Sequence, residues 1–211
     1  MRDLIDLQFD YAESISGPVP EYLLRIERQT YLKTLAPQMM SGRLQGRMLA
    51  MLAKLVRPQR VLEIGTFTAY GTLCIAEGLP EDGELHTIEG DAERAHLARQ
   101  HILQSPYHDR IRLYAGEAAE VLDDIEGNFD FIFLDGDKKG YPEYYRLLVE
   151  RLSSGGLLIA DNVLWDGKSA DHQTDPVAEK LREYNDRLLA DPRMEVVVLP
   201  LRDGLSVARK R

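Results

Sequence analysis

The chain has 211 residues, of which 44% are hydrophobic and 29% are charged, a composition typical of an ordinary globular protein. Its 35 acidic residues outnumber its 26 basic residues, and the formal net charge of -9 argues against broad binding to nucleic acids or membrane surfaces. The single cysteine, Cys74, excludes an internal disulfide and any cysteine-based metal site. With no signal peptide or membrane-spanning run in the sequence, we expect a cytoplasmic protein.

The first part of the chain, residues 1–58, is predicted to be a helical segment. Several apolar residues recur there at the spacing of a single helix face, and we interpret them as core packing: Leu44, Met48, Met51, Leu52 and Leu55.

From residue 59 onward, short β-rich runs alternate with helical patterns. Asp91 is a predicted N-cap and Pro106 a stop for one helix, and Pro142 suits the first turn of another. Nearly continuous apolar strands that alternate with helices indicate a parallel sheet covered on both faces. The predicted strands are 60–65, 84–89, 110–115, 130–135 and 157–161.

The last third of the chain departs from this alternation. A helix is predicted to begin at Asp175-Pro176, and strands 194–199 and 205–209 follow, joined by a short turn at Arg202-Asp203-Gly204. Two strands that close on each other are antiparallel. The expected fold is therefore an α/β, doubly wound sheet of five parallel strands with a hairpin at one edge, in a single domain over residues 1–211.

The run from Val61 to Thr72, VLEIGTFTAYGT, places a tight turn between a strand that ends in Gly65 and the next helix. A dinucleotide fingerprint needs glycines where this chain has Phe67 and Tyr70, and such a bulky loop excludes a pyrophosphate. Glu63 would also repel phosphate, which favours a cationic ligand without phosphates. S-adenosylmethionine (SAM) fits this description.

Two further strand ends support a nucleoside site at the same edge of the sheet. Glu89 ends the second predicted strand, 24 residues beyond Gly65, where an acid accepts hydrogen bonds from ribose hydroxyls. The run Gly116-Glu117-Ala118 follows the third strand and could cap an adenine.

Asp135 ends the fourth predicted strand, and Asp161-Asn162 ends the fifth. Because these strands are expected to be neighbours, the three side chains can converge on a hard cation such as Mg²⁺, Mn²⁺ or Ca²⁺. Lys138 lies three residues after Asp135, where a lysine beside a dication can act as general base, and Lys139 is the competing candidate.

Four motifs together resemble one known group: MMSGRLQG, VLEIGTFTAYGT, DFIFLDGDKKGY and DNVLW. The chain resembles the cation-dependent class I O-methyltransferases of the catechol and caffeoyl-coenzyme A type over residues 35–210. Its short leader before residue 20 resembles the small bacterial members more than the plant enzymes. The resemblance implies the Rossmann-like, seven-stranded class I methyltransferase sheet, with residues 59–211 as its core, and a homodimer.

The resemblance also implies a role for particular residues. Asp135, Asp161 and Asn162 would hold the divalent cation, and Lys138 would be the catalytic base. Met39, Asp137 and Trp165 would border donor and acceptor, and the loop 166–174 would shape the acceptor pocket. The family commonly has a serine where this chain has Gly71. The donor site would be lined by Ser41, Glu63, Gly65, Thr66, Gly71, Glu89, Ala118 and Asp135.

The resulting hypothesis is a divalent-cation-dependent O-methyltransferase that methylates one hydroxyl of a vicinal dihydroxy-aromatic small molecule and releases S-adenosylhomocysteine (SAH). The first alternative is a tRNA hydroxyuridine O-methyltransferase on the same scaffold. A nucleoside-binding module and a nicotinamide oxidoreductase are further alternatives. The tRNA alternative rests on a locally basic N-terminal region with Arg25, Arg28, Lys33, Arg43, Arg47 and Lys54.

Overall fold

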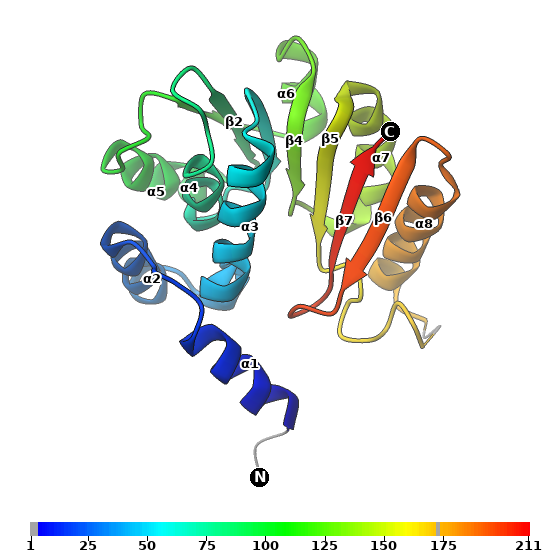
Figure 1. Ribbon diagram of the computed structural model, residues 1–211, viewed down its shortest axis with the longest axis horizontal. Helices are drawn as coiled ribbons and strands as arrows, with labels where there is room; N and C mark the ends of the chain where they lie inside the picture. Colours follow the sequence, from blue (N-terminus) through cyan, green and yellow to red (C-terminus); the bar gives the residue numbers. More distant parts are fainter. Residues whose placement is uncertain (1–3, 172–173) are drawn as a thin grey trace.

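The computed structural model describes residues 4–171 and 174–211, and a seven-stranded sheet forms its centre (Figure 1). The strands are β1 (Arg60–Ile64), β2 (Glu84–Glu89), β3 (Ile111–Ala115), β4 (Phe129–Leu134), β5 (Leu152–Asp161), β6 (Met194–Leu199) and β7 (Leu205–Lys210). They lie in the order β3-β2-β1-β4-β5-β7-β6. Strands β1 to β5 are parallel, and β7 runs antiparallel to both β5 and β6. The predicted α/β sheet with a hairpin at one edge is confirmed.

Helices cover both faces of the sheet, as the sequence predicts. They are α1 (Leu4–Ser14), α2 (Glu21–Lys33), α3 (Gly42–Val56), α4 (Tyr70–Ala76), α5 (Ala92–Leu103), α6 (Ala118–Asp124), α7 (Tyr141–Arg151) and α8 (Pro176–Ala190), with short 3-10 turns η1 (Pro37–Met39) and η2 (Lys138–Gly140). One hydrophobic core packs helices α2, α3, α4 and α5 against one face of the sheet. A second core packs helices α6, α7 and α8 against the opposite face. Helix α1 extends away from the sheet (Figure 1).

Because successive side chains point to opposite faces of the sheet, a single strand contributes residues to both cores. In β4, Phe131 and Phe133 pack in the core under α3 and α4, whereas Ile132 and Leu134 pack in the core under α7 and α8. Successive side chains of a strand point to opposite faces, so a strand buried on both faces has to be apolar throughout. This is why these strands have nearly continuous apolar sequences.

The helix caps agree with the sequence. The side chain of Asp91 accepts hydrogen bonds from the backbone N–H of Glu93 and of Arg94, both at 2.9 Å, at the start of α5. Asp175 caps α8 in the same way through two backbone amides. Each cap satisfies donors that the first helical turn leaves free.

The interpretation of the apolar face of α3 was wrong in part. Met51 and Leu55 are 64% and 76% exposed, whereas Leu49, Ala50 and Ala53 are buried. The buried face consists largely of small residues because α3 lies close to α4. The larger apolar side chains of Met51 and Leu55 therefore occupy the outer face, where they are free to meet a partner.

Strand β5 begins at Leu152, five residues before the predicted start, and its pairing with β4 shifts register between Phe129 and Phe131.

Among the described residues, no helix is long and apolar enough to cross a membrane.

Candidate active site

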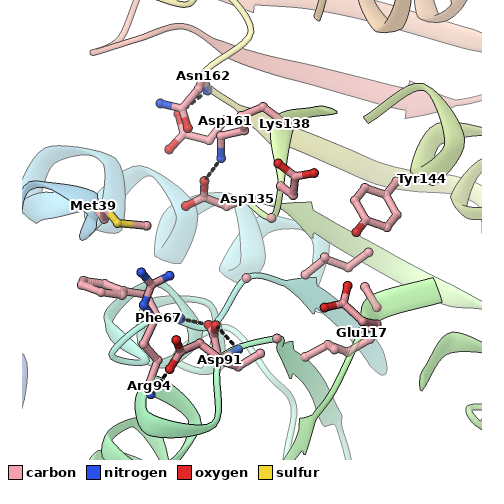
Figure 2. A pocket seen from close by; sticks show the side chains of 18 of the residues that line it. Met39, Phe67, Asp91, Arg94, Glu117, Asp135, Lys138, Tyr144, Asp161 and Asn162 are labelled. Carbon is pink, nitrogen blue, oxygen red and sulfur yellow. Dashed lines mark hydrogen bonds and ion pairs between the residues drawn. The ribbon is translucent and has the colours of Figure 1, made fainter. Parts of the chain in front are cut away.

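A cavity of about 660 Å³ opens at the carboxyl ends of β1 to β5 (Figure 2). Parallel strands place their carboxyl ends at one edge of the sheet, and ligands of open α/β sheets bind in the crevice there. The residues that line the cavity follow five different strands. Ten predicted site residues are among them: Met39, Gly65, Glu89, Ala118, Asp135, Asp137, Lys138, Asp161, Asn162 and Trp165.

The other four predicted site residues, Ser41, Glu63, Thr66 and Gly71, line a small recess. The recess shares Met39, Gly65 and Asp135 with the large cavity, so the two form one continuous site. The structure thus brings every predicted site residue to one place. The individual roles assigned to them stay predictions.

Glu63 is a buried carboxyl at the floor of the recess. Its Oε2 accepts hydrogen bonds from the hydroxyls of Thr72 at 2.5 Å and Thr87 at 2.6 Å. Burial raises the pKa of Glu63 from 4.5 to about 8, because desolvation outweighs the two threonine hydrogen bonds and nearby Asp135 opposes a second negative charge. A cationic group bound in the recess would favour the ionised form of Glu63.

Gly71 lies beside this carboxyl at the start of α4. A Cβ atom at residue 71 would stand 3.1 Å from Oγ of Ser41 and 3.3 Å from Oε1 of Glu63. The Ser41 hydroxyl therefore occupies the space next to Gly71.

Glu89 is held rigidly at the end of β2. Its Oε2 accepts a hydrogen bond from the backbone N–H of Phe67 at 2.7 Å, and its Oε1 accepts one from that of Asp91 at 3.1 Å. Two backbone donors fix the carboxylate at the mouth of the pocket. It has further lone pairs for ligand hydroxyls, which suits the predicted contact with a ribose.

Asp135, Lys138, Asp161 and Asn162 gather on one side of the pocket (Figure 2). The Nζ atom of Lys138 lies 2.6 Å from Oδ1 of Asp135. Burial raises the pKa of Asp135 from 3.8 to about 6, the Lys138 ammonium opposes this rise, and the charge of Asp161 adds to it. Lys139 is exposed and does not line the pocket, so the geometry favours Lys138 as the base.

The carboxylate of Asp161 is held by neutral donors only. Its Oδ2 accepts from Nε2 of Gln45 at 2.7 Å, and its Oδ1 accepts from the backbone N–H of Asn162 at 2.7 Å. Of the two neighbouring carboxyls, Asp135 pairs with the Lys138 ammonium, and the positive charge of Arg202 also acts on it. Within residues 4–171 and 174–211 no cluster of three His, Cys, Asp or Glu side chains is placed to hold a metal, so a site here needs the amide of Asn162. Two carboxylates and an amide oxygen fit a hard cation.

The sequence analysis missed several lining residues, among them Phe67, Arg94, Tyr144 and Arg202. Phe67 was considered only as an obstacle to a pyrophosphate, but its ring lines the cavity and lies 5.7 Å from the guanidinium carbon of Arg94. Gln45 was also missed. Its position one helical turn after Ser41 was the available signal, since residues four apart share a helix face.

Comparisons with known proteins identify the family of this chain. A model of the O-methyltransferase family matches residues 13–211. Caffeoyl-CoA O-methyltransferase 1 of Eucalyptus globulus is 35% identical over 178 residues, which cover 79% of this chain and 72% of that protein.

Two solved structures are also similar to this chain. The SAH-bound methyltransferase PaMTH1 of Podospora anserina has a TM-score of 0.90 and 29% identity, covering 98% of this chain and 95% of the other. The O-methyltransferase of Bacillus cereus in complex with SAH has a TM-score of 0.90 and 27% identity, covering 97% of each chain.

The chain therefore belongs to the O-methyltransferase family. Within this family it is a SAM-dependent O-methyltransferase of the caffeoyl-CoA O-methyltransferase type.

Proposed function

We propose that the protein transfers the methyl group of SAM to one hydroxyl of a catechol-type small molecule, and that the reaction depends on a divalent cation. The observation that carries this proposal is the pair of neighbouring carboxyls, Asp135 and Asp161, which line the cavity together with Asn162. A dication would stabilise both carboxyls in their ionised form, and the three side chains would supply its oxygen ligands.

The donor half of the proposal rests on Glu63 and Glu89. Glu63 offers a buried carboxyl to the cationic end of SAM, and Glu89 offers lone pairs to its ribose hydroxyls. Gly116, Glu117 and Ala118 line the same cavity, and the adenine would lie beside them. Both ends of the donor then meet groups of matching chemistry.

The cation half of the proposal rests on Asp135, Asp161 and Asn162, which would supply three oxygen ligands. When bound, a dication supplies charge that makes an acceptor hydroxyl more acidic. Met39, Asp137 and Trp165 border the adjoining space for the aromatic acceptor. Residues 172–173 of the proposed acceptor loop lie outside the described residues.

Lys138 in its neutral amine form, after release of its own proton to solvent, would take the proton from the acceptor hydroxyl at its Nζ atom. The acceptor oxygen then forms a bond to the methyl carbon while the carbon–sulfur bond of SAM breaks, which leaves a methyl ether and neutral SAH. The fixed geometry of Asp135 and Lys138 holds the reacting groups in one orientation, which is a large part of such catalysis.

The tRNA alternative gains no support from the basic N-terminal residues. Arg43 pairs with Glu27 at 2.9 Å, and Arg47 and Lys54 both pair with Glu77, at 2.6 and 2.9 Å. Half of the basic residues on which this alternative rests thus pair with neighbouring carboxylates. A small-molecule acceptor fits the pocket better than a polyanion does.

The location and the assembly belong to the same proposal. The buried free thiol of Cys74 is compatible with a reducing cytoplasm. The exposed Met51 and Leu55 on α3 offer an apolar face to a second copy of the chain. We infer a cytoplasmic homodimer.

The test is methyl transfer from labelled SAM to caffeic acid, with Mg²⁺ and then with EDTA. We expect turnover with Mg²⁺ and none with EDTA, and we expect Asp135→Ala to lose turnover more severely than it weakens SAH binding. Lys138→Met should lose at least about 100-fold in kcat, the usual contribution of a general base, while the matched control Lys139→Met keeps wild-type turnover. Full activity in EDTA would rule out the role of the cation.

A further inference from the structure

The connection between β6 and β7 lies at the same end of the sheet as the loop that follows β5 (Figure 1). It carries two adjacent charged residues, Arg202 and Asp203, to which the sequence analysis assigned no function. Their side chains contact two different segments of the active site. Arg202 contacts the segment before α3, and Asp203 contacts the loop after β5.

Arg202 holds the backbone of the segment before α3. Its Nη1 donates to the carbonyls of Met40, at 2.7 Å, and Ser41, and its Nη2 donates to the carbonyl of Gln38 at 2.9 Å. This segment carries Met39 and Ser41, which line the cavity and the recess. A planar guanidinium that spans several carbonyls fixes them relative to one another.

Asp203 holds the loop after β5. Its Oδ1 accepts a hydrogen bond from the backbone N–H of Asp166, and its backbone carbonyl accepts one from that of Leu164 at 2.9 Å. Its Oδ2 lies 3.4 Å from Nδ2 of Asn162. The carboxylate thus contacts two residues of the loop, Asn162 and Asp166, and the backbone carbonyl contacts a third, Leu164.

The contact with Asn162 determines which way its amide points. An ionised carboxylate only accepts hydrogen bonds, so the NH₂ group of Asn162 has to face Asp203. The amide oxygen is then left for another ligand. Asn162 also has a left-handed backbone, with φ of 62°, a conformation that needs support from its surroundings. The hydrogen bond from Val163 N–H to the carbonyl of Gly204, at 3.1 Å, supplies part of that support.

We propose that Arg202 and Asp203 are positioning residues for the two halves of the site. Arg202 positions the residues of the donor half that lie in the segment before α3. Asp203 orients the side chain of Asn162 so that its amide oxygen faces the cation half. The cation half of this inference rests on the proposed function. Neither residue touches the reacting atoms.

The test measures the binding of SAH and the binding of Mn²⁺ separately. SAH affinity is measured by calorimetry in EDTA, and Mn²⁺ affinity is measured by electron paramagnetic resonance without donor. We expect Asp203→Ala to weaken Mn²⁺ binding by about 10- to 100-fold, as loss of a partner of a metal ligand usually does, and to leave SAH binding unchanged. Arg202→Met should weaken SAH binding and should not weaken Mn²⁺ binding, because it removes a positive charge that acts on Asp135.

Two further variants distinguish the specific effects from a general loss of structure. Asp203→Asn keeps one acceptor oxygen and should restore part of the Mn²⁺ affinity. Glu195→Ala removes an exposed acid from the same hairpin, on β6, where it pairs with Arg211 at 3.4 Å, and it should change neither affinity.

Three outcomes would overturn the inference. In the first, Asp203→Ala binds Mn²⁺ as the wild type does, or Arg202→Met binds SAH as the wild type does. In the second, each variant weakens the binding of SAH and of Mn²⁺ equally, which indicates a merely structural role. In the third, the wild type binds no Mn²⁺, which removes the cation half of the proposed function and the role of Asp203 with it.

Discussion

Glu63 gives the ligand-free protein a pH dependence that its sequence position alone does not imply. Its pKa is raised to about 8, so the folded protein holds a proton that the unfolded chain releases at lower pH. The free energy of unfolding should therefore fall as pH rises towards 8. Asp135 acts in the same direction, but its pKa of about 6 confines most of its effect to lower pH.

Urea denaturation at about pH 6.5 and about pH 8.5 isolates the contribution of Glu63. The wild type should be less stable at the higher pH, and Glu63→Gln, which cannot ionise, should lose most of this difference. Glu195→Gln, at an exposed carboxylate, serves as the control and should behave as the wild type does. Equal pH dependence in wild type and Glu63→Gln would show that Glu63 is already ionised in the folded protein.

At the scale of residues, the convergence of the site could be predicted because strand ends meet at one edge of a parallel sheet. Glu89 and Asp161 each end a strand and Asp135 directly follows one, so topology alone brings them together. Helical periodicity places Gln45 on the same face as Ser41, but it does not predict the contact of Gln45 with Asp161. That contact, like the contact of Asp203 with Asn162, depends on side-chain rotamers and loop paths.

Among the elements, the turn between β1 and α4 is the most constrained. Gly65 has φ of 99°, and a Cβ atom there would collide with the backbone carbonyl of Asp135 on the neighbouring turn. The absence of a side chain at residue 65 therefore allows the two strand ends, and the groups they carry, to approach each other.

Gly65→Ala should consequently destabilise the protein by about 3 kcal/mol, from backbone strain together with overpacking, and should abolish SAH binding. Gly167→Ala is the matched control, because Gly167 also has a positive φ, of 76°, but a Cβ atom there meets nothing within 4 Å. Thermal denaturation and calorimetry measure both effects. Equal losses in the two variants would mean that only the backbone conformation matters at Gly65.

At the scale of elements, strands were predicted better than helix faces. The nearly continuous apolar runs located β1 to β4 closely, and the Asp91 and Asp175 caps located two helix starts. The buried face of α3 was predicted incorrectly because size, not only apolarity, decides which side packs. A Cβ atom on Gly46 would stand 2.8 Å from Sγ of Cys74 in α4, so the contact face has no room for Met51 or Leu55.

For the whole molecule, the exposed Met51 and Leu55 lead to a prediction about assembly. They lie one turn apart on α3, and contiguous exposed apolar residues on a helix commonly mark an interface. Light scattering on a sizing column should give twice the mass of one chain for the wild type, and Leu55→Asp should shift it towards the monomer. Leu189→Asp, at a residue that is 75% exposed on α8, should leave the mass unchanged. A monomeric wild type would refute the homodimer.

Both hydrophobic cores share the strands of one sheet, which supports the inference of a single domain over residues 1–211. Separate domains would each need a core of their own.

The internal position of β7 has a consequence for biosynthesis. β7 is the last of the seven strands to be made, yet it pairs with β5 on one side and with β6 on the other. While a ribosome is still synthesising the chain, the edge of β5 stays open and can pair with the wrong strand. Arg202 and Asp203 reach their partners only as this hairpin docks. The nascent enzyme therefore has no finished catalytic pocket until its final strand has left the exit tunnel.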